Sequence, residues 1–319
     1  DRVYEINRNF RNEGVSTRHN PEFTMLEFYQ AYANYHDLMR LTEELILFVA
    51  QEVNGTTITH FNGHEIDLSK WQKLSMREAI IKWLLADFDI TVDSAAFDDR
   101  DQFTKLLMQA RDVSQKVMMS YQFDPSAPIG TQLMTPLQLS MISKNRMLND
   151  VWREHLMKNA PLGKSIASLF ETVAEEHLIQ PTIIYDFPLA VSPLSKKKPD
   201  EPDWVERFEF YIGGFEVGNA FSELNDPDDQ RARFLQQVAE KAKGDAEATD
   251  MDEDYVRALG YGLPPTAGEG IGIDRLTMVL TNSKSIRDVI LFPLMRPILK
   301  QQPSQENPEE KPNEESTRK

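Results

Sequence analysis

Two glutamates, Glu209 and Glu216, have a spacing that would let them bind one divalent cation. They lie in two runs rich in aromatic and β-branched residues, 207–212 and 215–221, on either side of a Gly-Gly pair at 213–214. A glycine pair favours a tight two-residue hairpin turn, because glycine accepts the positive φ that such a turn requires. Carboxylates set close together repel each other unless a cation joins them, and Mg²⁺ held by carboxylates and substrate phosphates would fit. The alternative is two solvated acids on an exposed strand face.

The predicted turn also sets a register for the hairpin. Tyr211 should lie opposite Glu216 and Glu209 opposite Gly218, so that the two glutamates are diagonal neighbours on one face of the sheet. The other face is apolar and consists of Phe208, Phe210, Ile212, Phe215 and Val217. This alternation is typical of a half-buried sheet with a core side and a carboxylate side.

A second hairpin is predicted near the start of the chain, where residues 2–13 and 22–29 have the pattern of strands. The polar loop between them contains Gly14, His19 and Asn20. The side chains that would line the cleft are Arg11, Glu13, Phe23, Glu27 and Tyr29. An arginine suits phosphate or carboxylate, and an aromatic ring can stack on a base. A charged hairpin face with cross-strand ion pairs explains the spacing at least as well.

A glycine-rich strand supplies a third signal. Gly268, Gly270 and Gly272 alternate within residues 264–273 and precede Arg275 and an apolar helix. Alternate glycines let a ligand lie against bare backbone, and an arginine at a helix N-terminus favours phosphate or adenine. The spacing matches neither the P-loop nor the G-x-G-x-x-G pattern. A glycine-rich loop before a helix also occurs in every fold class.

Composition limits the class of protein. With 319 residues, 40% of them hydrophobic, the chain can bury a large core as one large domain or two of ordinary size. A formal charge of −16 argues against sequence-independent nucleic-acid binding through a basic surface, but leaves a shaped RNA contact open. The absence of cysteine excludes disulfides, zinc-thiolate sites and thiol nucleophiles, and fits a reducing cytosol. No apolar run reaches the roughly 18 residues of a membrane span, so no membrane partner is expected.

Capping signals predict the helices that hold these strands in place. Asp37 can cap a helix that ends at Gly55. Ser75 and Glu78 form a capping box for a second helix. The Asn-Asp-Pro run at 225–227 marks the start of a third.

From about residue 87 to 160 the chain is helical and rich in methionine, which we interpret as an inserted helical subdomain. Its methionines are expected to be flexible core filler: Met118, Met119, Met134, Met141 and Met147. His155 is expected to be structural or exposed, and the three lysines at 196–198 to lie in a solvated loop. Residues 301–319, rich in Pro, Glu, Asn and Ser, are expected to form a disordered tail.

Three segments resemble one family. FRNEG together with RHNPEF, between residues 10 and 23, resembles motif 2 of the class II aminoacyl-tRNA synthetases, and GIGIDR at 270–275 resembles motif 3. With FEVGNAFSELND at 215–226, they resemble the lysyl-tRNA synthetases of that class specifically. The match covers roughly residues 1–85 and 160–298, and three motifs in the family order make it specific.

The resemblance implies an α+β fold, an antiparallel sheet flanked by helices, in a catalytic domain over residues 1–300 with the helical insertion at about 87–160. It implies a two-step reaction in the cytoplasm: ATP activates lysine as lysyl-adenylate, and the lysine then passes to the 3′ end of tRNA(Lys). ATP and Mg²⁺ are the expected substrate and cofactor. A homodimer is expected for the full-length family, but motif 1, the anticodon-binding barrel and the upstream strands that hold the lysine α-amino group are absent from this sequence. We therefore expect the isolated chain to be weakly active or inactive.

The resemblance also assigns roles to individual positions. Arg11 and Arg275 would be catalytic, with Arg11 on the α-phosphate and the lysine carboxylate. Glu209 and Glu216 would bind Mg²⁺. The expected ATP-binding residues are Arg11, Glu13, His19, Asn20, Phe23, Gly272 and Arg275, with Phe23 and Arg275 on either side of the adenine.

The expected lysine-binding residues are Glu27, Tyr29, Asn219 and Glu223. A desolvated ε-ammonium needs anionic partners, whereas an aspartate or asparagine enzyme has no use for the carboxylates of Glu27 and Glu223. Strict alternation would point Asn219 toward the apolar face, so its role requires a β-bulge near Gly218.

Two other functions fit the sequence. A truncated synthetase paralogue could make lysyl-adenylate and lysylate a protein or another acceptor, which the lack of an anticodon-binding module favours and the ordinary motifs disfavour. A catalytically silent module that binds lysine or adenylate would be marked by loss of Arg11, Arg275 or a metal carboxylate, and all of these are present.

Overall fold

The computed structural model describes residues 1–12, 14–120, 135–244 and 248–294. Its centre is a seven-stranded sheet with the order β1-β2-β9-β8-β7-β6-β5. Neighbouring strands are antiparallel except β5 and β6, which are parallel. The strands are β1 (Arg2–Phe10), β2 (Glu22–Ala31), β5 (Gln72–Ser75), β6 (Thr182–Pro188), β7 (Trp204–Tyr211), β8 (Glu216–Ser222) and β9 (Thr266–Gly272). This sheet, flanked by helices, is the expected α+β fold.

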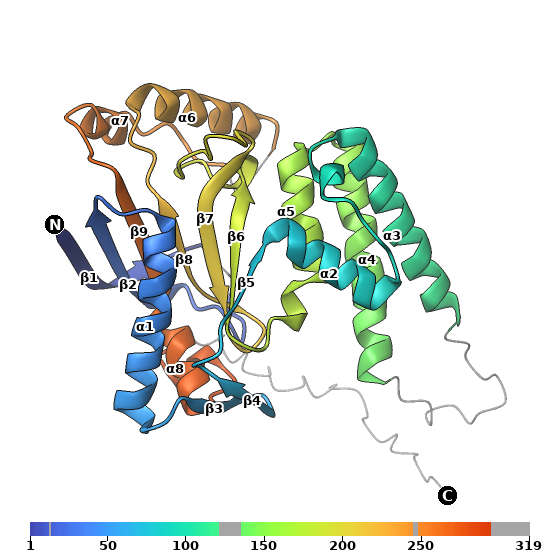
Figure 1. The fold of residues 1–319 in the computed structure, drawn as a ribbon, viewed down its shortest axis with the longest axis horizontal. Coiled ribbons are helices and arrows are strands. Elements are labelled where there is room, and N and C mark those ends of the chain that lie inside the picture. The colour runs from blue at the N-terminus through green and yellow to red at the C-terminus, as the bar shows by residue number, and fades with distance from the viewer. Residues whose placement is uncertain (13, 121–134, 245–247, 295–319) are drawn as a thin grey trace, which may run out of the picture.

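Helices gather around the sheet in three places (Figure 1). One face is covered by α1 (Tyr35–Asn54), with α8 (Ile273–Thr281) and the small β3–β4 hairpin (Ile58–Phe61 and His64–Asp67) beside it. At one end of the strands lie α6 (Pro227–Ala242) and α7 (Glu253–Leu259). Beside the β5–β6 edge, four helices pack together: α2 (Met76–Phe88), α3 (Arg100–Ser120), α4 (Pro136–Met157) and α5 (Leu162–Val173).

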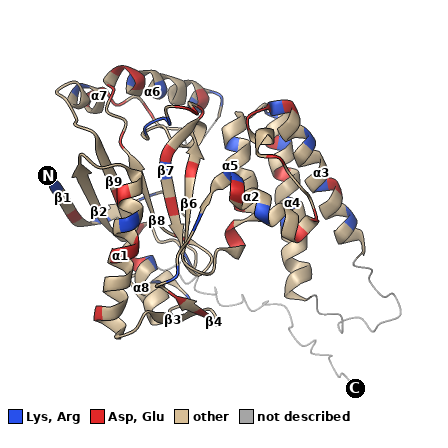
Figure 2. Cartoon of the chain, in the orientation of Figure 1, with Lys and Arg blue, Asp and Glu red and all other residues tan. Residues whose placement is uncertain are grey.

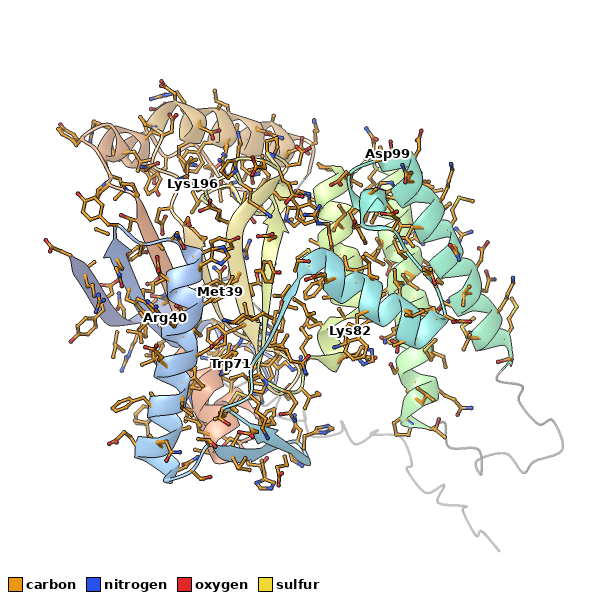
Figure 3. All side chains as sticks on the ribbon, viewed as in Figure 1. Met39, Arg40, Trp71, Lys82, Asp99 and Lys196 are labelled. Carbon is orange, nitrogen blue, oxygen red and sulfur yellow. The ribbon has the colours of Figure 1, made fainter. Side chains whose placement is uncertain are left out.

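The apolar face of the β7–β8 hairpin forms a core with α1. Its five predicted core residues are at most 3% exposed: Phe208, Phe210, Ile212, Phe215 and Val217. On α1, Met39 is buried in this core whereas Arg40 is on the solvent side (Figure 3). Trp71, just before β5, meets Phe210 edge-on, with ring centroids 6.0 Å apart. The prediction of a half-buried hairpin with a core side is therefore confirmed.

Most helix ends follow the predicted signals, with one correction. Ser75 and Glu78 form the capping box of α2, and Gly55 closes α1 with a φ of 67°. The N-cap of α1 is Asn34 and not Asp37, which instead accepts a hydrogen bond from the Asn34 backbone as the third residue of a capping box. The predicted first strand also ends early, at Phe10, since Arg11 already lies outside β1.

The methionine-rich helices are only partly as predicted. Met141 is buried, but Met119 and Met147 are 64% and 39% exposed, so the prediction that they fill a core is wrong for both. His155 is fully buried and structural: its ring bonds Thr104 Oγ1 at 3.0 Å and Ser165 Oγ at 2.8 Å. Residues 134 and 301–319, for which predictions were made, lie outside the described residues.

Ion pairs hold two of the three lysines of the predicted solvated loop at residues 196–198, whereas Lys196 is exposed as predicted. Lys197 Nζ lies 3.2 Å from Asp229 of α6, and Lys198 contacts Asp186 and Glu201. Acidic and basic residues both occur along α3 and α6 as well (Figure 2). Among the helices of the described residues, none is long and apolar enough to cross a membrane.

Candidate active site

The β7–β8 hairpin has the predicted two-residue turn. Gly213 and Gly214 have φ angles of 72° and 82°, which fit a type I′ turn, and Tyr211 pairs with Glu216 as predicted. A Cβ atom on Gly213 would lie 2.6 Å from the Phe61 ring. The turn therefore needs glycine for its backbone angles and for its packing.

Beyond the turn, the register differs from the predicted one. Glu209 pairs with Asn219 and not with Gly218, because Val217 is an extra residue in β8. This β-bulge lets Glu216 and Asn219, three positions apart, both face away from the core. The bulge that the role of Asn219 requires is thus present.

Four strands bring the polar side chains into two adjacent rows. From β2 to β7, the first row of cross-strand partners is Glu27, Gly270, Asn219 and Glu209. The second row, two residues further along each strand, is Tyr29, Gly268, Phe221 and Arg207. Segments almost 200 residues apart in the chain therefore share one surface of the sheet.

A cavity of about 190 Å³ lies on this surface. Of the predicted site residues, Glu209 does not line it, and Glu13 lies outside the described residues. The predicted residues that do line it are Arg11, His19, Asn20, Phe23, Glu27, Tyr29, Glu216, Asn219, Glu223, Gly272 and Arg275. The structure therefore brings nearly all of the predicted residues together.

The alternate glycines of β9 make room for side chains of the protein itself. A Cβ atom on Gly268 would lie 2.5 Å from Glu223 Oε1 and 2.6 Å from the Tyr29 ring. One on Gly270 would lie 2.8 Å from Met25 Cε. At these two positions the freed space holds neighbouring side chains, and both glycines also line the cavity where the predicted ligand would lie.

One end of the cavity is cationic. Arg275 donates through Nη1 to the backbone oxygen of Glu216 at 2.8 Å and to its Oε2 at 3.3 Å. Its Nη2 lies 3.1 Å from His19 Nε2. Because arginine can only donate, this imidazole nitrogen accepts, and Nδ1 carries the proton that reaches Ser16 Oγ at 3.0 Å.

Arg11, Phe23 and Asn20 complete this end. The Arg11 guanidinium lies over the Phe23 ring, 5.3 Å from its centroid. Asn20 is 2% exposed and donates through Nδ2 to the Glu22 backbone oxygen. Within the described residues its Oδ1 is buried without a hydrogen-bond partner. This oxygen is thus an acceptor that a ligand could use.

The Glu209 carboxylate is held by its neighbours. It accepts hydrogen bonds from Arg207 Nη2 at 2.5 Å and from the Tyr211 hydroxyl at 2.6 Å. Arg207 also donates through Nε to Asn219 Oδ1 at 2.9 Å.

Burial and the nearby Glu209 carboxylate raise the pKa of Glu216 to about 7, against the opposing effect of Arg275. The carboxylates of Glu209 and Glu216 therefore repel each other, as expected for two carboxylates on one face of the sheet.

The other end of the cavity is acidic. Glu223 is 8% exposed, and burial raises its pKa to about 8. Burial, Glu223 and Glu27, in that order, raise the pKa of Tyr29 to about 12. Three groups that prefer a cation among them therefore lie together. Glu223 and Tyr29 lie against Gly268, whereas Arg275 lies against Gly272, four residues further along β9.

Comparison with known proteins agrees with this arrangement. The family model "tRNA synthetases class II (D, K and N)" matches residues 1–296. The chain belongs to this family. Among its relatives, the lysine–tRNA ligase of Pelotomaculum thermopropionicum is 48% identical over 298 residues, which are 93% of this chain and 50% of that protein. The lysine–tRNA ligase of Moorella thermoacetica is 46% identical over 93% of this chain and 51% of its own length, and the heat-inducible one of Escherichia coli 47% over 93% and 50%. The chain spans about half the length of the curated relatives it matches.

In this class II synthetase chain, sequence reasoning missed three groups of the site. Arg207 lies on the same strand face as Glu209 and joins it to Asn219; their i, i+2 spacing was the available signal. Arg18 lines the cavity and lies over the Phe215 ring, but its loop position gives no periodicity. The hydroxyl of Tyr211 reaches Glu209, although the residue was assigned only to the hairpin register.

Proposed function

We propose that this chain carries the catalytic site of a lysine–tRNA ligase, which activates lysine with ATP and transfers it to tRNA(Lys). The observation that carries the proposal is the two-ended cavity, with guanidinium groups at one end and a buried acidic group at the other. The names of the relatives support the same activity. The acidic end of the cavity would bind the ε-ammonium of lysine, and the cationic end would bind the phosphates of ATP.

ATP would bind at the cationic end. A lysine carboxylate oxygen attacks the α-phosphorus, the bond from that phosphorus to the bridging oxygen breaks, and pyrophosphate leaves. Arg11 and Arg275 are the proposed catalytic residues, since both line the cavity, and Arg11 can neutralise charge that develops on the α-phosphate. The proposed ATP contacts also include Glu13, His19, Asn20, Phe23 and Gly272, with Phe23 and Arg275 stacking on the adenine.

Mg²⁺ fits Glu209 and Glu216 by donor type and by charge. Carboxylates are the ligands that this hard cation prefers, and the repulsion that raises the pKa of Glu216 would be relieved by a cation between the two. When bound there, the ion would neutralise charge on the ATP phosphates. Arg207 and Tyr211 would keep the Glu209 carboxylate oriented toward it.

Lysine would lie along the first row of the sheet. Its ε-ammonium would meet Glu27, Tyr29 and Glu223, and its carboxylate Asn219, whose Oδ1 is bonded to Arg207 so that its amide N–H groups face away from that arginine. Glu223 is protonated at neutral pH without a ligand, and an ammonium beside it would favour the carboxylate form. Lysine binding should therefore release a proton from Glu223.

The remaining parts of the proposal concern the whole protein. Residues 1–300 would form the catalytic domain, with the helical insertion at about 87–160 and a tail at 301–319. The aminoacyl group would pass to the tRNA acceptor end in the cytoplasm, and the full-length protein would be a homodimer. The family model supports the catalytic domain, since it matches residues 1–296, and the names of the relatives support tRNA as the acceptor.

ATP–pyrophosphate exchange tests the proposed function. It should be measured on the full-length protein with lysine, asparagine and aspartate in turn, and repeated with Glu223→Gln. Exchange with lysine alone, reduced about a hundredfold or more in kcat/KM by Glu223→Gln, is the expected result, because the variant removes a buried charged partner. Exchange with aspartate or asparagine would contradict the proposal. Exchange with lysine but no charging of tRNA(Lys) would favour another acceptor.

A further inference from the structure

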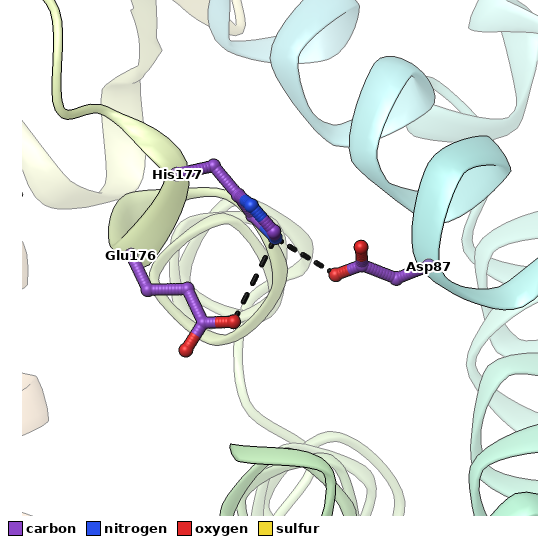
Figure 4. Close-up of side chains that lie close together, drawn as sticks. All are labelled: Asp87, Glu176 and His177. Carbon is purple, nitrogen blue, oxygen red and sulfur yellow. Dashed lines mark hydrogen bonds and ion pairs between the residues drawn. The ribbon is translucent and has the colours of Figure 1, made fainter. Parts of the chain in front are cut away.

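A buried lysine joins three elements beside the active site. Lys144 of α4 is 3% exposed, and its ammonium contacts the carboxylate of Asp87 in α2. The same Nζ lies 2.6 Å from Glu176 Oε1 and 3.0 Å from His177 Nε2, both in η2 (Glu175–His177). Figure 4 shows how the three partner side chains converge from α2 and η2. One ammonium therefore compensates two carboxylates at the junction of these elements.

These partners have the spacing of metal ligands, but the chain supplies its own cation. One ligand atom each from Asp87, Glu176 and His177 lies within 4.8 Å of the others. The ammonium of Lys144 lies against all three and so occupies the place between them that a metal ion would take. Trp83 covers the cluster by stacking on His177, with ring centroids 3.9 Å apart and planes inclined by 8°. The cluster thus connects α2, α4 and η2.

Hydrogen bonds continue from η2 to the active site. Directly after η2, the backbone oxygens of Leu178 and Ile179 accept from the amides of Gly214 at 3.0 Å and Gly213 at 2.8 Å. These glycines form the turn of the β7–β8 hairpin. On the site side, Arg18 Nη1 donates to the Gly214 backbone oxygen at 3.3 Å and lines the cavity. Each step from α4 to the cationic end is therefore a direct contact.

Glu175, the first residue of η2, is within electrostatic range of the same end. Burial raises the pKa of its carboxyl, Arg18 and Arg275 oppose that rise, and Glu209 adds to it. These groups all belong to the cationic end or to the acidic pair beside it. The acidic end is held differently, because Glu27 and Tyr29 belong to β2 and pair with β9. Glu223 follows β8 at the end away from the turn, and its backbone N–H donates to the Thr266 backbone oxygen at 2.8 Å.

We propose that Lys144 is a positioning residue: by holding η2 against α2 and α4, it fixes the Gly213–Gly214 turn and with it the phosphate end of the site. The catalytic consequence rests on the proposed function, but the mechanical link does not. Loss of the ammonium leaves the Asp87 and Glu176 carboxylates with only the His177 ring between them, whose Nε2 lies 2.8 Å from Asp87 Oδ2 and 3.7 Å from Glu176 Oε1. The repulsion between the two carboxylates would push η2 away from α2. The effect should reach ATP and spare lysine, because no contact in this series leads to the acidic end.

Hydrogen exchange tests the mechanical link without any assay of function. In the full-length protein with Lys144→Met, the amides of Gly213 and Gly214 should exchange at least about tenfold faster than in the parent, since their acceptors follow η2 directly. Lys158→Met is the matched control: this residue also lies at α4, but its side chain is 66% exposed and, within the described part of the chain, pairs with Glu154. Unchanged exchange at both glycines in a folded Lys144→Met protein would overturn the proposal.

Kinetics separate positioning from a merely structural role. In pyrophosphate exchange, Lys144→Met should raise the KM for ATP roughly threefold to thirtyfold and leave the KM for lysine within about twofold. Lys144→Arg, which keeps the charge, should restore most of the parental value. A lower melting temperature with both KM values unchanged would overturn the proposal, as would equal changes in both.

Two further outcomes stay informative. If Lys144→Met does not fold, Glu176→Gln removes one partner at the rim of the cluster, where the Glu176 side chain is 47% exposed, and the same two measurements decide. If the parent shows no exchange with lysine at all, the proposed function fails, and faster amide exchange at the turn still supports the link from Lys144 while unchanged amide exchange still contradicts it.

Discussion

At the scale of single residues, the site is defined by where charge is buried. Glu223 is almost fully buried, and burial raises its pKa to about 8. For Glu216, burial and the Glu209 carboxylate raise the pKa, whereas the Arg275 guanidinium lowers it. The same residue type therefore serves two ends of one cavity, because its neighbours differ. Two predictions follow at this scale, one from the proton on Glu223 and one from Arg207.

Lysine binding should depend on pH through Glu223. The carboxylate form binds an ammonium, and the pKa of about 8 keeps the free site mostly protonated at neutral pH, so lysine affinity should rise as pH rises from 6 to 8. The expected slope approaches about tenfold per pH unit at its steepest, with release of nearly one proton per lysine at pH 7. Calorimetry in two buffers of different ionisation enthalpy measures that proton. The Glu223→Gln variant should bind lysine weakly, with an affinity that does not change between pH 6 and 8. If the affinity of the parent protein is also constant over this range, Glu223 is not the group that binds the ammonium.

Arg207 should matter for catalysis although it does not line the cavity. It holds Glu209 and Asn219 and donates to the Val191 backbone oxygen at 2.8 Å. Arg207→Met leaves these acceptors unpaired, so kcat should fall about tenfold or more, and the free energy of unfolding by about 1–3 kcal/mol. Arg257→Met in α7, where the side chain is 71% exposed, is the control and should change neither. Unchanged kcat in Arg207→Met would show that Glu209 and Glu216 bind the metal ion without the hydrogen bond from Arg207.

At the scale of elements, the hairpin and the glycine strand decide which side chains meet. The turn of the β7–β8 hairpin could be predicted from its two glycines, and the apolar face from the period-two alternation. The bulge could not, because nothing in the spacing of residues 216–219 marks Val217 as extra; only the role assigned to Asn219 required it. The use of the β9 glycines was also hidden, since a pattern of glycines does not say whether a ligand or a side chain fills the space.

Gly268→Ala tests that use of space. The new methyl group would lie 2.5 Å from Glu223 Oε1 and 2.6 Å from the Tyr29 ring, so these groups must move. The KM for lysine should rise about tenfold, in line with the loss of a well-oriented ionic contact. The KM for ATP should stay within about twofold, since the phosphate end is a separate set of residues. Gly260→Ala, whose Cβ would meet only backbone oxygens, the nearer at 3.2 Å, serves as the control. An equal rise in both KM values would count against a local effect.

At the scale of the whole molecule, two cores meet along the sheet: one under α1 and one among the helices beside β5 and β6. The helices and their caps could largely be predicted from local signals such as Ser75 and Glu78. The buried contacts between elements could not, because Lys144, Asp87 and His177 lie in separate segments whose sequences resemble solvated helix faces. Docking of the helices onto the sheet therefore adds interactions that local sequence does not reveal.

Buried His155 should make stability depend on pH. Burial, with a contribution from Arg100, lowers its pKa to about 4, below the value of roughly 6.5 for the unfolded chain. The unfolded state then binds more protons between these values, so this residue's contribution is fully present above pH 6.5 and is lost as pH falls toward 4. Urea unfolding should show a decline of roughly 2 kcal/mol from this residue over that interval. His155→Gln should have a lower but flatter profile; an equally steep decline would assign the effect to other groups.

The most direct test of the two-ended cavity is a comparison of two isosteric variants in pyrophosphate exchange on the full-length protein. Glu223→Gln should raise the KM for lysine about a hundredfold and leave the Mg²⁺ and ATP dependence near the parental values. Glu216→Gln should do the reverse, with a large change in the Mg²⁺ concentration at half-maximal rate and a lysine KM within about threefold of the parent. If both variants alter both substrates alike, the division of the cavity into a phosphate end and an ammonium end is wrong.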